Sequence, residues 1–411
     1  MRQKLLCPGV IGVALLVGLA GVPGVVAAEG WRPWELSASV AEAYDSNRDS
    51  TKTHTVALLE SIVGVRAALK GNLEQTDYSV FYAPSYCYRD NPRWNQERSN
   101  LYHDAGLDVE HRFTPRLRAD VKDTFTWTDE PAIMNQDFTI RENITYRQNC
   151  AAIGGNYEVL PGRAVVGLSG DHLIKRYLND KDYAANGNET EIGGGLNARY
   201  LMRSGINVLA DVSARQNELS TTNAVSDDIS RNSTVIFGGL GLEKLFAMWR
   251  VRGRVGMDFA KYDNAVVSSG SNPGVDVDIS YLATAASALN LAIQYRTLRA
   301  DVSPYTVQQR TSVNLSADHS FGERLKCSVY GIYAKGDYKA ETVALFNGVP
   351  VVLGKLDGSD TVTAIGANAG YNVTQNVKID VGAGYQDWNA DKFLRTSHDR
   401  ITGKVAVTAS F

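Results

Sequence analysis

Three arginine residues stand at alternate positions in one short stretch of the sequence, "WRVRGRVGMDF". If this stretch is a β-strand, Arg250, Arg252 and Arg254 share one face and follow one another at about 7 Å. A guanidinium group stays charged at any workable pH and can pair with a carboxylate through two hydrogen bonds. The trio therefore predicts a positively charged strip that meets successive acidic groups of an extended ligand. An ordinary water-facing wall, in which arginines pair with acids of adjacent strands, is an equally weighted alternative.

Further charged residues belong to the same hypothesis. Asp276 and Asp278 are expected at the far end of the following strand, where they would not neutralise the trio. Arg296, Lys326 and Lys378 are expected to point the same way as the trio, near the same end of the fold. The six basic residues are the candidate ligand contacts.

The residue patterns of enzymes and metal sites are missing from this sequence. It holds neither a G-x-S-x-G nucleophile motif nor an H-E-x-x-H pair, and its six histidines are scattered. Asp357 and Asp360 could contact a calcium ion, but a solvated loop explains "DGSD" better. Cys87, Cys150 and Cys327 are too few and too widely spaced for a disulfide framework or a zinc site. They are expected to be free thiols, with one disulfide as an open alternative, and we expect no enzyme, no metal and no cofactor.

Period-two alternation recurs along the chain and predicts the elements that carry these residues. In "VKIDVGAGYQD", Val377, Ile379 and Val381 fall on one face, and Lys378 and Asp380 fall on the other. The stretches "INVLADVSAR" and "RLRADVKDTFTW" alternate in the same way. This is the pattern of β-strands with one apolar and one polar face.

Connections of two kinds separate these strands. Short turns are expected at 71–72, 114–116, 160–163, 203–205, 246–248, 284–288, 321–323 and 374–376. Longer polar stretches are expected near 45–52, 90–99, 129–136, 179–189, 219–232, 264–274, 303–307, 341–360 and 390–398. Their alternation implies eighteen strands, and short turns on one side with long loops on the other are typical of bacterial outer-membrane barrels. The prediction is an all-β fold, a single closed antiparallel transmembrane β-barrel of eighteen strands over residues 29–411. A soluble β-sandwich is disfavoured because the apolar faces are thinly built from Ala, Val, Gly and Leu.

Two connections carry separate expectations. Within the longest one, "TVALFNGVPVVL" (342–353) is expected to form a small hairpin that turns at Asn347-Gly348 and projects from the barrel or folds over its mouth. The third connection, 129–136, is too short to fold into the lumen as a constriction.

The beginning of the sequence reads as a secretory signal peptide over residues 1–28. "MRQKLL" supplies positive charge, "IGVALLVGLA" an apolar run, and "GVVAAEG" small residues for cleavage after Ala27 or Ala28. Cleavage removes Arg2 and Lys4, which leaves a net charge of 40 − 45 = −5. This balance gives no reason to expect nucleic acid as a partner. The expected location is the outer membrane of a Gram-negative-type cell, with membrane lipid around the barrel.

The last residues, "KVAVTASF", form an alternating stretch that ends on an aromatic side chain. Val405, Val407, Ala409 and Phe411 share one face. This stretch resembles the C-terminal assembly signal of outer-membrane barrels, and the resemblance implies recognition by the barrel-assembly machinery.

A wider resemblance rests on an early Tyr-rich hairpin, "TDYSVFYAPSYCYRDN", followed by "YHDAGLDVEHRFTPRLRADVKDTFTW". Similar sequence stretches recur at "SALNLAIQYRTLRADVS" and "FGERLKCSVYGIYAKGDY". Together these stretches resemble the porin-type barrels found among exopolysaccharide-export genes. The resemblance implies a channel that passes exopolysaccharide from the periplasm to the cell surface, with a periplasmic polysaccharide-export component as partner. A general or anion-preferring diffusion porin, and a structural or adhesive surface barrel, are the alternatives.

Overall fold

The computed structural model describes residues 33–48, 52, 55–92, 97–129, 145–177, 188–220, 232–263, 269–300, 307–346, 349–391 and 397–411. For 219–220, 299 and 340–356 only the backbone is described. The predicted signal peptide, the Asn347-Gly348 turn and much of the long connections lie outside the described residues.

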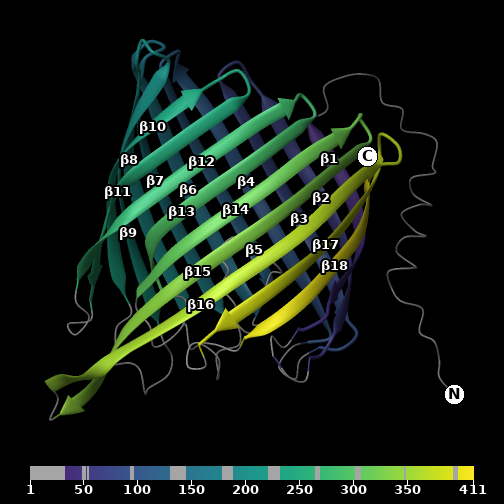
Figure 1. The fold of residues 1–411 in the computed structure, drawn as a ribbon. Helices are drawn as coiled ribbons and strands as arrows, with labels where there is room; N and C mark the ends of the chain where they lie inside the picture. The colour runs from purple at the N-terminus through teal and green to yellow at the C-terminus, as the bar shows by residue number, and fades with distance from the viewer. Residues whose placement is uncertain are drawn as a thin grey trace.

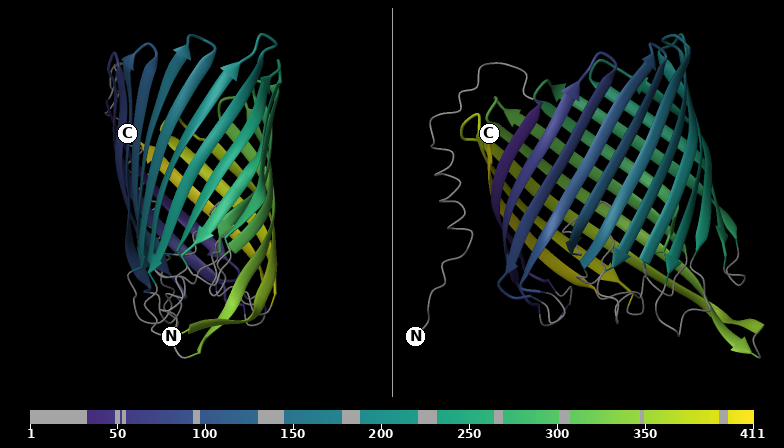
Figure 2. Two further views of the ribbon diagram at one scale, coloured as in Figure 1. Left: turned by 90° about the vertical axis from the view of Figure 1, so that its left-hand side faces the viewer. Right: turned by 180° about the vertical axis from the view of Figure 1, so that it is seen from behind.

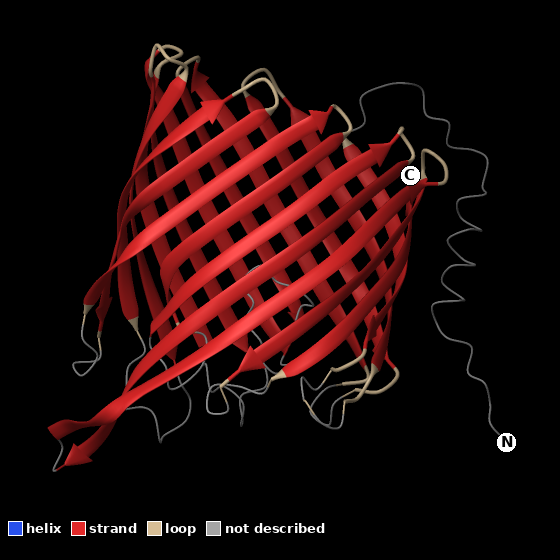
Figure 3. Cartoon of the chain, viewed as in Figure 1, coloured by secondary structure: helices blue, strands red, loops and turns tan. Residues whose placement is uncertain are grey.

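The described residues form eighteen antiparallel β-strands in one sheet (Figures 1 and 3). The first nine are β1 (Trp34–Asp45), β2 (Leu58–Asn72), β3 (Thr76–Arg89), β4 (Ser99–Thr114), β5 (Leu117–Asp129), β6 (Thr145–Leu160), β7 (Ala164–Tyr177), β8 (Asn188–Leu201) and β9 (Ile206–Ser220). The second nine are β10 (Ser233–Leu245), β11 (Trp249–Tyr262), β12 (Gly270–Thr284), β13 (Ser287–Arg299), β14 (Val307–Phe321), β15 (Leu325–Phe346), β16 (Val349–Asn372), β17 (Val377–Ala390) and β18 (His398–Ser410). No helix in this part of the chain is long and apolar enough to cross a membrane.

The first strand closes the sheet into a barrel. β1 pairs with β2 on one side and with β18 on the other, so that Val40 lies opposite both Val63 and Val407. Each strand leans strongly against the barrel axis, as Figure 2 shows from two sides. Closure pairs the backbone groups of every strand, which a lipid environment requires. The predicted eighteen-stranded closed barrel is confirmed.

Short turns join the strands at one edge of the barrel, at the top of Figure 1, within one to three residues of the predicted positions. The first turn begins later than expected, because Gly71 and Asn72 still belong to β2. Gly162, Gly205 and Gly322 sit in three of these turns with φ of 67°, 75° and 65°. Residues with a Cβ rarely adopt this backbone conformation, so glycine is required for such tight reversals.

Two expectations concern the long-loop edge. The arms 342–346 and 349–353 pair with each other as far as Phe346 and Val349, as expected of a hairpin, and they continue β15 and β16. The pair projects beyond the other strands at the lower left of Figure 1. The third long connection, expected at 129–136, lies almost wholly outside the described residues: β5 ends at Asp129, and β6 is described from Thr145 onward.

The outer face of the barrel is an apolar band. On β11, for example, Val251, Val255 and Phe259 are exposed on the face opposite to the arginines. Exposed aromatic side chains ring the short-turn edge: Trp34, Phe113, Tyr157, Tyr200, Phe246, Trp249, Phe321, Tyr371 and Phe411. An apolar band bordered by aromatic residues is the surface that a transmembrane barrel presents to lipid. The opposite, polar face of each strand therefore lines the lumen.

A buried ion network ties strands together near the long-loop edge. The Arg89 guanidinium contacts Glu60 at 2.7 Å and Asp129 at 3.0 Å, and its side chain is only 3% exposed. Tyr102 donates a hydrogen bond to Asp129 at 2.7 Å. The network joins β2 to β5, because each of these strands contributes one of the four residues.

Candidate functional site

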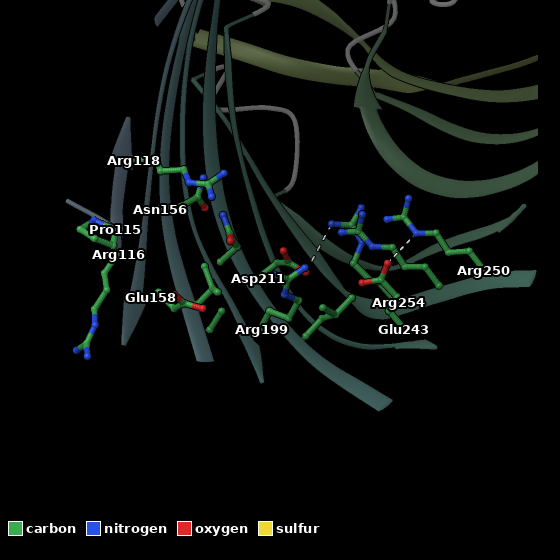
Figure 4. A pocket seen from close by; sticks show the side chains of 15 residues that line it. Pro115, Arg116, Arg118, Asn156, Glu158, Arg199, Asp211, Glu243, Arg250 and Arg254 are labelled. Atoms are coloured by element: carbon green, nitrogen blue, oxygen red, sulfur yellow. Dashed lines mark hydrogen bonds and ion pairs between the residues drawn. The ribbon is translucent and has the colours of Figure 1, made fainter. Parts of the chain in front are cut away.

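A recess of about 710 Å³ lies in the lumen wall near the short-turn edge (Figure 4). Its lining comes from the β4–β5 turn and from strands β5 to β11: Pro115, Arg116, Arg118, Asn156, Glu158, Val165, Asn197, Ala198, Arg199, Leu209, Asp211, Glu243, Arg250, Arg252 and Arg254. Among these described residues, six arginines face three acidic residues. The lining therefore carries an excess of positive charge.

The predicted arginine trio lies in this recess, and two of its members are paired with acids. Arg250 contacts Glu243 at 2.7 Å. Arg254 contacts Asp276 at 3.1 Å and Asp211 at 3.5 Å. Two of the three guanidinium groups are therefore ion-paired, as in the alternative of an ordinary water-facing wall, and the expectation that Asp276 would not neutralise the trio is wrong.

The register of β11 against β12 explains this correction. Arg254 pairs with Asp276 across the two strands, and Arg252 pairs with Asp278. Antiparallel strands place opposite one another those residues that lie at similar distances from their connecting loop. Asp276 and Asp278 are well inside β12, so they lie level with the arginines and not at the far end of the strand.

Three arginines of the recess have no ion pair within the part of the chain that the structure describes: Arg116, Arg199 and Arg252. The Nε of Arg252 is buried and also lacks a hydrogen-bond partner among the described residues. The sequence analysis did not select Arg116 and Arg199 as ligand contacts. Alternation alone places Arg199 on the polar face of "GGGLNARYL", but it cannot show that β8 and β11 contribute to one recess.

The other candidate contacts lie elsewhere in the lumen. Lys326 and Lys378 are close to short turns at the starts of β15 and β17, as expected, and Lys378 contacts Asp380 at 2.6 Å. Arg296 is not near that edge, because it lies toward the long-loop end of β13. The grouping of Arg296 with the trio at one end is therefore wrong, although Asp276 contacts both Arg296 and Arg254.

Arg296 is held against the wall and is not available as a free contact. It forms two hydrogen bonds through Nε and Nη2 to Asp258, whose side chain is fully buried, at 3.1 Å and 2.9 Å. Its guanidinium group also lies 4.0 Å from the centre of the Phe237 ring. Gly239 and Gly256 leave the space that this ring occupies, since a Cβ at either position would collide with it. The cluster is a packed part of the wall.

The chemistry of the recess is weak attraction of anions. Guanidinium groups in a water-filled lumen are screened, and each exposed contact is worth about 1 kcal/mol or less. Such contacts raise the local concentration of negatively charged solutes without trapping them. The three described cysteines, Cys87, Cys150 and Cys327, are free thiols.

The residues of the predicted assembly signal lie on the outward face of β18. Val405 is exposed, Val407 lies opposite Val40 of β1, and Ala409 is buried. The Phe411 amide donates a hydrogen bond to the Leu36 carbonyl at 2.8 Å, so the last residue is part of the closing seam.

Comparisons with known proteins agree with the fold. No family model matches the sequence, and no curated protein does. The FrpB iron transporter from Neisseria meningitidis (F5-1 variant) superposes with a TM-score of 0.51 at 10% identity, over 92% of this chain and 81% of that chain. OccK1 (OpdK) from Pseudomonas aeruginosa superposes with a TM-score of 0.50 at 9% identity, over 92% of this chain and 99% of that chain. At such low identity the likeness shows the fold alone, which is that of outer-membrane β-barrels.

Proposed function

We propose that this chain is an outer-membrane channel that passes anionic solutes and engages them first at its short-turn edge. The observation that carries the proposal is the arginine-rich recess, in which Arg116, Arg199 and Arg252 have no ion pair among the described residues. In bacterial outer-membrane barrels the short turns face the periplasm. The recess would then meet solutes that leave the periplasm. FrpB, which shares the fold, is an iron transporter, and this supports transport as the class of function.

For the cargo we propose an acidic exopolysaccharide. The recess draws on seven neighbouring strands and one turn, so an extended acidic chain can meet several guanidinium groups in succession. The resemblance to porin-type barrels of exopolysaccharide-export genes supports the same cargo. It also supports a periplasmic export component as partner and the barrel-assembly machinery for insertion.

A small-anion porin is the second candidate, and one observation favours it. Ion pairs neutralise Arg250 and Arg254. The three recess arginines without an ion pair among the described residues lie apart, in the β4–β5 turn, on β8 and on β11, and do not form a continuous ladder. Isolated charges of this kind suit small anions as well as a polymer.

Planar-bilayer recordings separate these possibilities. The reversal potential in a KCl gradient measures anion preference, and an oligomer of an acidic sugar is then added on the short-turn side, with a neutral oligomer of equal length as control. Anion preference with block by the acidic oligomer alone supports the exporter. Anion preference without block supports the small-anion porin, and the absence of anion preference contradicts both.

A further inference from the structure

We infer that Arg147 and Arg176, on the outer wall near the long-loop edge, bind the phosphate group of a glycolipid in the outer leaflet of the membrane. The site lies on the lipid-facing side of the barrel and does not rest on the proposed cargo.

Strand alternation places both arginines on the lipid-facing side. Arg147 of β6 has the same parity as Ile153, and Arg176 of β7 has the same parity as Leu168; both apolar side chains are exposed on the outer face. The two arginines are exposed as well, and they lie directly opposite each other in the register of β6 with β7. The Cβ atoms of such a cross-strand pair are about 5 Å apart. The two guanidinium groups can therefore reach one anion.

The lumen side of the wall is packed at this level. Tyr146 and Tyr177, which stand next to the arginines on the same strands, point to the lumen and are buried. Lys175 is buried with them, and its Nζ lies 4.0 Å and 5.1 Å from the centres of the two rings. Because these side chains fill the inner face, the two guanidinium groups stay on the outer face.

Each guanidinium group is held in place without a carboxylate. Arg147 lies over the ring of Trp127, 4.1 Å from its centre, and this side chain offers no oxygen acceptor. Arg176 donates a hydrogen bond from Nη1 to the Glu189 carbonyl at 2.7 Å and one from Nη2 to Thr190 Oγ1 at 3.0 Å. These contacts position the two cations and leave N–H donors of both for a ligand.

Among the described residues, no acid forms an ion pair with either arginine. The nearest carboxylates on β5 are engaged elsewhere, since Asp129 contacts Arg89 at 3.0 Å and Asp123 accepts a hydrogen bond from Asn149 at 2.6 Å. Like charges directly opposite each other destabilise a strand pair, and an uncompensated charge on a membrane-facing surface is costly. An anion between the two guanidinium groups removes both costs.

The height of the pair on the outer wall matches that of lipid headgroups. Tyr157, one of the aromatic residues of the short-turn edge, lies ten residues from Arg147 on β6. With about 3.4 Å per residue and a tilt of roughly 40°, this separation spans about 26 Å along the barrel axis. The apolar band of such barrels is about 25 Å tall, so Arg147 lies at its opposite border. Adjacent strands about 4.8 Å apart at this tilt differ in height by about 3 Å, so Arg176 lies at the same border.

The anion that fits this position is a headgroup phosphate. The short turns of outer-membrane barrels face the periplasm, so the pair meets the outer leaflet, which is built of glycolipids with phosphate on their sugars. Guanidinium groups bind phosphate oxygens through paired, charge-assisted hydrogen bonds. Further along the same strands, Ile153 and Leu168 expose apolar side chains to acyl chains, which a free phosphate ion lacks.

Lipid binding to the purified barrel tests the pair. The full barrel is refolded in detergent without bacterial lipid and titrated with diphosphorylated lipid A, and native mass spectrometry measures the fraction of barrels that carry lipid. Replacing Arg147 and Arg176 together by Gln should weaken binding about tenfold or more, because both charge-assisted contacts are lost. The matched control is Lys244→Gln with Lys261→Gln, which removes two outward positive charges from β10 and β11. The control should bind within about twofold of the parent.

Two further titrations separate the phosphate from the lipid. Lipid A without its phosphates should bind the parent as weakly as it binds the double Gln variant, and a large excess of inorganic phosphate should leave diphosphorylated lipid A on the parent. Heat-modifiable gel mobility shows that every variant is a folded barrel. The inference is wrong if the folded Gln variant binds the lipid as well as the parent does, or if the control loses as much. Displacement of the lipid by inorganic phosphate would also overturn it, because the pair would then be a site for a free ion.

Discussion

Three arginines of the recess lack an ion pair among the residues that the structure describes, and they should set the ion selectivity of the channel. We predict that replacing Arg116, Arg199 and Arg252 together by Ser shifts the permeability ratio from anions toward cations. The ion-paired Arg250 and Arg254 stay in place, so their acidic partners remain compensated. The change removes three positive charges and leaves the strand pairing intact.

Coulomb's law gives the size of the effect. An ion that passes about 7 Å from a guanidinium group in water interacts with it by about 0.6 kcal/mol. Screening with a Debye length of about 8 Å at 0.15 M salt lowers this to roughly 0.25 kcal/mol. The interaction energies of anions and cations have opposite signs. Each arginine therefore contributes about 0.5 kcal/mol to the free-energy difference that sets the permeability ratio, and three contribute about 1.5 kcal/mol. The expected shift is about tenfold at 0.15 M, and less than twofold at 1 M, where the Debye length is about 3 Å.

The assay is the reversal potential of the purified barrel in a planar bilayer at both salt concentrations. Replacing the same three residues by Lys is the matched control, and this variant should keep the parent ratio because the charge is unchanged. A folded triple-Ser variant whose ratio shifts less than twofold at 0.15 M would refute the argument. A shift of the same size at 1 M would show that screened charge is not its cause.

Three further predictions concern assembly and stability. Deleting Phe411 should lower the amount of heat-modifiable barrel in the outer membrane, since its amide closes the seam to β1; normal levels would contradict this role. Replacing Gly256 by Ala should destabilise the barrel by about 1–3 kcal/mol in urea unfolding, because the new Cβ would collide with the backbone of β10 and the Phe237 ring. The control is Gly238→Ala on β10, which should be close to neutral because its new Cβ meets no atom within 4 Å. Replacing Arg89 by Met should lower the free energy of unfolding by about 3–5 kcal/mol, because two carboxylates lose their buried partner. The control Arg118→Met breaks only an exposed contact of 4.0 Å and should lower it by about 1 kcal/mol or less. Equal losses for the last two variants would show that burial does not govern the network.

The sequence alone determined the architecture of the barrel. A period of two fixes which side chains share a face, and it needs no knowledge of any neighbouring strand. Short turns and long loops alternate in the sequence as they do in the structure, so eighteen strands could be counted before any pairing was known. The count was insensitive to errors of a few residues at the strand ends, as β2 illustrates.

The two-residue alternation also pointed to a charged residue on the apolar face, which the sequence analysis missed. In "RLRADVKDTFTW", Asp123 occupies a position at which Val121 and Phe125 predict an apolar side chain. An acid at such a position indicates a charged group on the lipid-facing surface. Its partner could not be foreseen, because Asn149 belongs to a different strand.

The tertiary structure decided which charges meet. Alternation sends Arg250, Arg252 and Arg254 into the lumen, but only the register of β11 with its neighbours sets Arg254 beside Asp211 and Asp276. A shift of two residues along one strand preserves every face and changes every ionic partner, so a pattern of faces carries no information on pairing. The same register leaves Arg252 without an ion pair in the described part of the chain, and the tilt of the strands brings Arg116 and Arg199 into the same recess. The sequence could therefore predict the barrel and its polar lining, whereas the position of the arginine-rich recess follows only from the staggered closure of the sheet.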